Sequence, residues 1–152
     1  MPTSAPKTKG HCLCGAIEYE FSGKPLWVSH CHCETCRRHT SSAVATFVGV
    51  KIDQFSYLKG TPAAYQSSPD VWRYFCPTCG SPMAYTSDKK HPGEVHLYIG
   101  TLESPGQFAP KGHVHAGEQL PWFEVDDELP RYQQMGTGAE PIRKGSNRKA
   151  GA

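Results

Sequence analysis

Short runs in which apolar and polar residues alternate recur along the chain and predict β-strands. In the first run Ile17, Tyr19 and Phe21 fall on one side and glutamates on the other. The runs with strand character are AIEYEF (16–21), SAVATFVGV (42–50), WRYF (72–75) and EVHLYIG (94–100). The segment after Cys33 predicts a short helix, and residues 105–108 predict a single turn. We therefore expect a mostly β fold built from short strands.

Proline and glycine separate these runs, and the two ends of the chain differ from the middle. With 152 residues the chain is long enough for one domain. We expect a disordered N-terminal tail (1–9), a folded domain (10–132) and a flexible basic C-terminal tail (133–152). The tails hold six of the sixteen Lys and Arg, whereas residues 10–132 hold ten against thirteen Asp and Glu. Basic tails are usually solvated, so nucleic acid is not an expected partner.

The compartment follows from what the sequence lacks. No apolar run is long enough to span a bilayer, and MPTSAPKTKG at the N-terminus has no apolar region of a secretory signal. Both observations favour a cytoplasmic protein with no membrane partner, in which thiols stay reduced. The seven cysteines are an odd number, which argues against a full set of disulfides. Clustered cysteines in a reducing compartment indicate a metal, and Zn²⁺ is the commonest.

The cysteines form three groups. They are Cys12 with Cys14, then Cys31 with Cys33 and Cys36, then Cys76 with Cys79. The CPTCG segment is a good metal-binding turn, because Pro77 bends the chain and Gly80 tolerates an unusual backbone dihedral. A closed tetrahedral site uses four ligands, so seven cysteines leave three for a site with one open position, as a catalytic metal requires.

Spacing alone does not decide which four cysteines share an ion. Cys33 and Cys36 could join the last pair, or the first pair could join it and leave the middle triplet as a local tripod. The second site could also be a closed structural cage, with a histidine as its last ligand. The nearby candidates for that ligand are His30, His32 and His39.

Six segments in order make the sequence resemble a known family. They are GHCLCGAIEYEF, SHCHCETCRRHTSSA, GTPAAYQSS, WRYFCPTCGSPM, GTLESPGQFAPKGHVH and PWFEVDDELPRY. Together, over roughly residues 9–132, they resemble the glutathione-dependent formaldehyde-activating enzymes, also called the GFA or centromere-protein-V domain family. The resemblance implies an Mss4-like fold of several small coiled antiparallel sheets around a structural zinc.

The resemblance also implies roles for the cysteines. Cys12, Cys14, Cys76 and Cys79 would share a structural zinc. Cys31, Cys33 and Cys36 would hold a second, functional zinc and form the catalytic site. The implied enzyme is a carbon–sulfur lyase that forms or cleaves S-hydroxymethylglutathione or a related thiol–aldehyde adduct, with glutathione as possible co-substrate and formaldehyde as the aldehyde.

Residues beside the triplet suggest how a substrate would bind. Arg37 and Arg38 could hold a glutathione carboxylate or offset the negative charge of three thiolates. Ser41 stands where the family often has glycine, which would narrow the space for substrate. His113 and His115 alternate in GHVHAG, a pattern typical of half-buried strand histidines.

Two other functions remain open from the sequence. The chain could be a non-catalytic zinc-binding scaffold, or a thiol-redox protein in which Cys33 and Cys36 form a reversible disulfide. The sequence does not indicate an oligomeric state.

Overall fold

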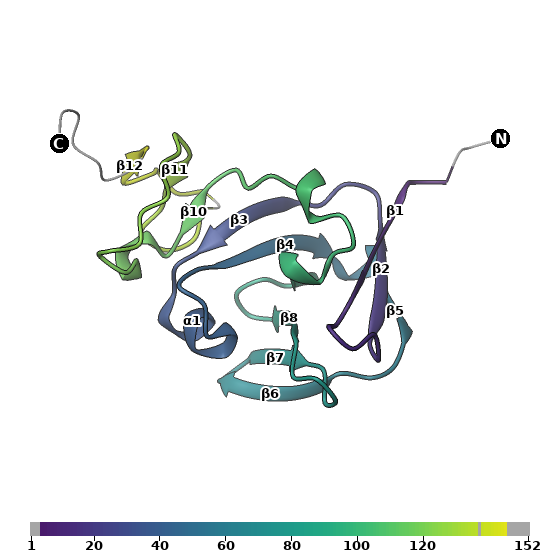
Figure 1. Cartoon of the computed structure of the whole chain (residues 1–152). Helices are drawn as coiled ribbons and strands as arrows, with labels where there is room; N and C mark the ends of the chain where they lie inside the picture. Colours follow the sequence, from purple (N-terminus) through teal and green to yellow (C-terminus); the bar gives the residue numbers. More distant parts are fainter. Residues whose placement is uncertain (1–3, 137, 146–152) are drawn as a thin grey trace. The chain divides into compact units, whose positions relative to one another are not determined.

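The computed structural model describes residues 4–136 and 138–145, which form two compact units (Figure 1). The first unit comprises the chain up to Trp27 and the segment Phe47–Ala109. The second comprises Val28–Thr46 and the chain from Pro110 onward.

The first unit contains two antiparallel sets of strands. One has the order β1 (Lys7–His11), β2 (Glu18–Ser22) and β5 (Phe55–Lys59). The other has the order β4 (Ala45–Lys51), β9 (Glu94–Tyr98), β8 (Pro82–Ser87), β7 (Val71–Phe75) and β6 (Ala63–Ser68). This unit also has three single-turn 3₁₀ helices: η1 (Ile52–Gln54) joins β4 to β5, and η2 (Ile99–Thr101) and η3 (Pro105–Gln107) follow β9.

The second unit is smaller and holds the helix. Its elements are β3 (Trp27–Cys31), α1 (Glu34–Thr40), β10 (His113–Val114), η4 (Ala116–Glu118), β11 (Pro130–Arg131) and β12 (Arg143–Lys144). Strand β10 runs parallel to both β3 and β11, and β12 pairs antiparallel with β11. The His113 position of β10 therefore lies beside His30 of β3 on one side and Arg131 of β11 on the other.

The mostly β fold with several antiparallel pairings is confirmed. The alternating runs became β2, β4, β7 and β9, and the expected helix and single turn became α1 and η3. The alternation at the start of the chain marks the core of the first unit: Ile17, Tyr19 and Phe21 are all buried. Tyr19 shares a 2.6 Å hydrogen bond with the Thr101 hydroxyl, so its buried oxygen has a partner. Burial of each such side chain contributes about 2 kcal/mol.

The structure places short β-strands inside both expected tails. Lys7–Lys9, assigned to a disordered tail, belong to β1, because this strand pairs with the buried strand β2 along its whole length. Arg143 and Lys144, assigned to a flexible tail, form β12 against β11. Composition indicated solvated tails, but backbone pairing with an existing strand supplies hydrogen bonds that composition does not reveal. The rest of the tail calls at 1–3, 137 and 146–152 lies outside the described residues.

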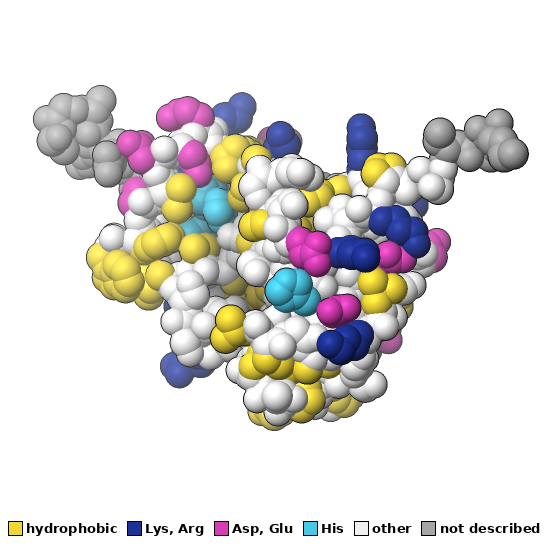
Figure 2. Space-filling model, turned by 45° about the vertical axis from the view of Figure 1, so that its right-hand side comes forward, with side chains coloured by type: hydrophobic (Ala, Val, Ile, Leu, Met, Phe, Trp, Pro, Cys, Tyr) yellow, Lys and Arg dark blue, Asp and Glu magenta, His cyan; other side chains and the backbone are white. Residues whose placement is uncertain are grey.

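The surface carries mixed charge. Figure 2 shows Lys and Arg side chains standing beside Asp and Glu on the face it presents, and Lys7 pairs in this way with Glu20. Within residues 4–136 and 138–145, no helix combines the length and apolar character that crossing a membrane demands.

The approach of Gly60 to Ala16, two residues before β2, gives a test of the first unit. A Cβ at Gly60 would lie 2.2 Å from the backbone oxygen of Ala16, and the residue has φ +72°. Gly60→Ala should therefore lower the free energy of unfolding by about 2–4 kcal/mol through overlap and left-handed strain. At Gly100 an added Cβ meets nothing within 4 Å, so Gly100→Ala should stay within about 0.5 kcal/mol of wild type. Urea unfolding measures both, and equal midpoints for the two variants would contradict this packing.

Candidate functional site

The first unit brings four cysteines together. Cys12 and Cys14 follow β1, and Cys76 and Cys79 lie in the turn between β7 and β8. The Sγ atoms of Cys12 and Cys14 are 3.6 Å apart, those of Cys14 and Cys76 are 3.8 Å apart, and all four lie within 4.8 Å of one another. Zn–S bonds of about 2.3 Å in a tetrahedron give S–S edges of about 3.8 Å. The donor set and its spacing fit a closed Zn²⁺ site.

The two halves of this cluster are built by the same local device. After Cys12 the chain turns back at Gly15 (φ +79°), whose N–H donates to the Cys12 carbonyl over 3.1 Å. After Cys76 it turns back at Gly80 (φ +77°), whose N–H donates to the Cys76 carbonyl over 2.8 Å. Both turns need a residue that adopts a left-handed dihedral without strain, and glycine does so.

These turns also direct backbone N–H groups at the sulfurs. Ile17 N–H donates to Cys12 Sγ over 3.3 Å, and Cys79 N–H donates to Cys76 Sγ over 3.5 Å. Hydrogen bonds from the hydroxyl and backbone of Ser81 lower the pKa of the Cys79 thiol to about 5. A thiol that loses its proton this readily is prepared to bind a metal.

The second unit brings the middle three cysteines together. Cys31 ends β3, Cys33 caps the start of α1, and Cys36 lies in its first turn; all three are buried. Cys36 Sγ is 3.7 Å from Cys31 Sγ and 2.7 Å from Cys33 Sγ. The first distance matches an edge of a zinc–sulfur tetrahedron, and the second is shorter than such an edge but longer than a disulfide of about 2.05 Å.

Cys33 is more acidic than Cys31. Hydrogen bonds from the Cys31 and Cys36 thiols, together with the Cys36 N–H at 3.3 Å, hold its pKa far below the ordinary value. Hydrogen bonds with the Cys33 and Cys36 thiols, together with burial, raise the pKa of Cys31. The cluster therefore favours one shared negative charge, and a cation is required before all three thiols can ionise inside the protein.

No fourth ligand completes this tripod within residues 4–136 and 138–145. The ligand atoms that converge there are the three sulfurs, and no histidine or carboxylate joins them. The two histidines next to the cysteines are engaged elsewhere: His30 Nδ1 lies 2.8 Å from Thr46 Oγ1, and His32 Nε2 lies 2.8 Å from His113 Nδ1. The expectation that a histidine closes the cage therefore finds no support in the geometry.

The histidines instead form a buried chain that ends on a carboxylate. Asp127 Oδ2 lies 2.9 Å from His113 Nε2 and accepts a hydrogen bond from the N–H at that ring position. His113 Nδ1 is then the acceptor of that ring, so His32 must donate from Nε2. Arg131, which is 1% exposed, donates to Asp127 Oδ1 over 2.5 Å and offsets its charge.

This chain keeps the imidazoles neutral. Burial lowers the pKa of His30 and of His32 to about 4, and it lowers the pKa of His113 despite the hydrogen bond to Asp127. Sequence reasoning expected His113 on a strand but missed its two partners. His32 lies 81 residues away and Asp127 14 residues away, and only the parallel pairing of β10 with β3 brings the two histidines together.

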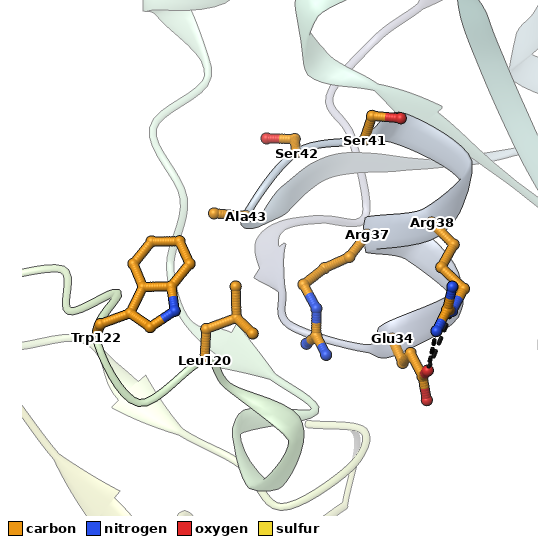
Figure 3. A pocket seen from close by; sticks show the side chains of 8 residues that line it. All are labelled: Glu34, Arg37, Arg38, Ser41, Ser42, Ala43, Leu120 and Trp122. Carbon is orange, nitrogen blue, oxygen red and sulfur yellow. Dashed lines mark hydrogen bonds and ion pairs between the residues drawn. The ribbon is translucent and has the colours of Figure 1, made fainter.

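A pocket of about 370 Å³ opens beside α1 within the second unit (Figure 3). Its lining residues are Glu34, Arg37, Arg38, Ser41, Ser42, Ala43, Leu120 and Trp122. Arg37 donates to the carbonyls of His32 and Glu118, whereas Arg38 is turned toward Glu34, with which it forms a 3.0 Å ion pair. Arg37 thus fixes the backbone beside the tripod, and Arg38 holds an exposed charge at the pocket edge.

Ser41 ends α1 in a left-handed conformation, with φ 55° and ψ 25°. This explains why glycine is suited to the position: a left-handed dihedral costs a residue with a Cβ about 1–2 kcal/mol. Ser41 is also one of the residues that line the pocket.

One protein family matches the part of the chain that contains both cysteine clusters. The model of the family described as glutathione-dependent formaldehyde-activating enzyme matches residues 7–118. The match contains all seven cysteines, both halves of the first cluster and the whole tripod. Asp127 and Arg131, at the end of the histidine chain, lie beyond it.

Two individual proteins are also similar to this chain. An uncharacterized lyase of Schizosaccharomyces pombe (strain 972) is 36% identical over 86 residues, which are 55% of this chain and 62% of the yeast protein. The matched part therefore spans less than two thirds of that relative. A crystal structure of a Rhodobacter sphaeroides protein, a structural genomics target, is similar with a TM-score of 0.53 and 26% identity, covering 62% of this chain and 87% of the other.

The backbone at Ser41 yields one prediction. Ser41→Gly should raise the free energy of unfolding by about 0.5–1 kcal/mol, because relief of left-handed strain exceeds the added entropy of the unfolded chain. Ser42→Gly, one residue along, relieves no such strain and should lower stability by up to about 1 kcal/mol. Thermal unfolding compares the two, and a stabilised Ser42→Gly or a destabilised Ser41→Gly would contradict the cause assigned here.

The histidine chain predicts a pH dependence. Because the pKa of His113 is lowered in the fold, the unfolded chain binds more protons once the pH falls below about 6.5. Stability from this group is complete above that pH and is lost as the pH falls toward the folded pKa. His113→Gln should reduce the slope of unfolding free energy against pH below 6.5 by up to about 1.4 kcal/mol per pH unit. Denaturant titrations from pH 5 to 8 measure it, and parallel profiles for wild type and variant would refute the assignment.

Proposed function

We propose that this chain, which belongs to the family of glutathione-dependent formaldehyde-activating enzymes, is a zinc-dependent carbon–sulfur lyase acting on thiol–aldehyde adducts. The observation that carries the proposal is the tripod of Cys31, Cys33 and Cys36: three converging buried sulfurs that no fourth ligand joins within residues 4–136 and 138–145. A lyase name on the yeast relative supports the reaction class. The preferred substrates are glutathione and formaldehyde, with S-hydroxymethylglutathione as the adduct.

Two zinc ions would have different tasks. Cys12, Cys14, Cys76 and Cys79 supply all four ligands of a tetrahedron and would hold a structural ion. The tripod supplies three ligands, and Zn²⁺ held there would offer one position at which a thiol loses its proton near neutral pH.

The aldehyde needs no activation in the proposed reaction. Formaldehyde is already electrophilic, so the difficult step is to present a thiolate. The thiol sulfur bonds to the carbonyl carbon, the π electrons move to oxygen, and the thiol proton ends on that oxygen; the reverse reaction cleaves the C–S bond. Three cysteine thiolates make the centre electron-rich, which favours delivery of a thiolate over polarisation of a carbonyl.

The surrounding residues fit a small anionic thiol. The pocket at α1 has a volume of about 370 Å³. Arg37 and Arg38 line it from the helix that also carries Cys36. Arg38 is exposed and paired only with the exposed Glu34 in the ion pairs of the described residues, so a substrate carboxylate can compete for it at low cost. Arg37 holds two backbone carbonyls, which makes it a positioning residue for the turn that bears Cys33.

One observation favours a second candidate. The 2.7 Å between the sulfurs of Cys33 and Cys36 is short enough for these thiols to join with little movement if an oxidant removes two electrons and two protons. In that case the triplet would act in thiol redox chemistry. A scaffold function, in which both metals only hold the fold, predicts no turnover of either kind.

A rate measurement separates these functions. Zinc-reconstituted protein should accelerate the loss of free formaldehyde in glutathione above the uncatalysed rate. Cys36→Ser should lower that acceleration at least about 100-fold, because it removes one of three ligands at the centre. Gly100→Ala serves as the control that retains activity, since an added Cβ there meets nothing within 4 Å.

Circular dichroism should show that Cys36→Ser remains folded, and the zinc content should fall by one per chain. Equal rates with and without protein would refute the enzyme. The redox function would replace the lyase proposal if the protein is inactive, its mass is lower by two hydrogen atoms, and peptide mapping shows Cys33 linked to Cys36.

A further inference from the structure

A third cluster of metal-binding side chains lies in the first unit, in residues that neither cysteine site uses. The ligand atoms of His91, Glu94 and His96 lie within 4.8 Å of one another. His96 Nε2 is 2.8 Å and His91 Nδ1 is 3.7 Å from the same oxygen, Glu94 Oε2.

The sequence HPGEVH builds this cluster locally. Pro92 and Gly93 occupy the centre of a turn closed by a 3.2 Å hydrogen bond from Glu94 N–H to the His91 carbonyl. Gly93 has φ +73°, as the second central residue of a type II turn requires, and proline suits the first. The turn returns His91 to the start of β9, where Glu94 and His96, two residues apart, fall on the same face.

Packing holds the His96 ring in place. Gly49 of β4 lies opposite His96 in the strand register, and its missing side chain leaves room for Trp27, whose ring would be 2.2 Å from a Cβ there. Trp27 meets His96 edge-on at 4.5 Å, and Tyr85 stacks on His96 at 5.2 Å. A ligand whose rotamer is fixed by its neighbours loses little entropy when it binds a metal.

The charge of the cluster is not balanced by a cation of the protein. Among the described residues the ion-pair partners of Glu94 are His91 and His96, and no Lys or Arg pairs with it. Lys51 lies opposite Glu94 in the strand register but forms no ion pair with it. The His96 hydrogen bond lowers the pKa of Glu94, so its carboxylate is ionised at neutral pH.

In the other histidine cluster, a cation of the protein already balances the carboxylate. His30, His113 and Asp127 also lie within 4.8 Å of one another, but Arg131 already pairs with Asp127 at 2.5 Å. Both nitrogens of His113 are used within the protein. A divalent cation would have to displace those bonds and compete with Arg131, whereas at Glu94 it displaces the His96 hydrogen bond and competes with no Lys or Arg ion pair among the described residues.

We propose that His91, Glu94 and His96 form a third metal site, which takes one divalent transition metal of borderline character, such as Zn²⁺ or Ni²⁺, through two imidazole nitrogens and one carboxylate oxygen. Two imidazoles and a carboxylate with positions left over form a known class of such sites. The site would tie the turn at His91 to β9 and give the chain a nitrogen–oxygen metal centre beside its sulfur centres.

Nickel titration tests the proposal. Protein reconstituted with two Zn²⁺ per chain, one for each cysteine cluster, should bind one further Ni²⁺ per chain while the zinc content stays constant by elemental analysis. Tryptophan fluorescence should be quenched in step with binding, because Trp27 contacts His96. Trp27→Phe should bind nickel but lose most of that quenching.

His91→Ala and Glu94→Gln should each weaken nickel binding at least tenfold, since each removes one of three ligands. His91 lies in a surface turn, so its variant should keep the fold, which thermal unfolding checks. His115→Ala, a histidine of the second unit outside the cluster, is the matched control and should bind as wild type does. Nickel uptake unchanged in folded His91→Ala, or nickel that only displaces zinc, would overturn the site.

Discussion

Buried sulfur is the constraint on which both units depend. Five of the seven cysteines are buried, and they are gathered so that sulfurs stand about as far apart as the edges of a zinc–sulfur tetrahedron. Neutral thiols make weak hydrogen bonds, and neighbouring thiolates repel, so such clusters are poor substitutes for apolar packing. A shared cation removes both costs. Short strands with few large apolar residues would then suffice, because an ion held by the cysteines would connect turns that the core alone would hold weakly.

The backbone supplies the positions from which the sulfurs converge. Gly15 and Gly80 take the same left-handed dihedral after two cysteines far apart in sequence, and each turn aims N–H groups at sulfur. At the tripod, the start of α1 does the corresponding work, with Cys33 as the capping residue. The single left-handed serine at the other end of this helix shows that the helix must stop there even without glycine. The positions of the sulfurs are therefore set largely by turns and by the start of α1, rather than by the strands.

The sequence predicted the elements with strong local signals. Alternation identified β2 and β9, and the buried face of β2 is the one expected. Spacing could not decide how the cysteine pairs combine, because both groupings satisfy the same local turn geometry; the resemblance named the grouping that the structure brings together. β1 and β12 escaped prediction because their composition is that of a tail and only pairing with a distant strand orders them. The His32–His113 contact has no local signal at all, since 81 residues separate its partners.

For the proposed lyase, the electrostatics beside the tripod would favour activation of a thiol over activation of a carbonyl. The neighbouring imidazoles are neutral at physiological pH, because burial holds the pKa of His30 and His32 near 4. Arg37 donates to backbone carbonyls, and Arg131 is committed to Asp127. These two arginines therefore do not neutralise the charge of the three sulfurs. A metal held there would remain electron-rich. An electron-rich centre raises the nucleophilicity of what binds to it and polarises a carbonyl poorly. An aldehyde that needs no activation, such as formaldehyde, suits that limitation, whereas a less reactive carbonyl would require a donor to its oxygen from outside the tripod.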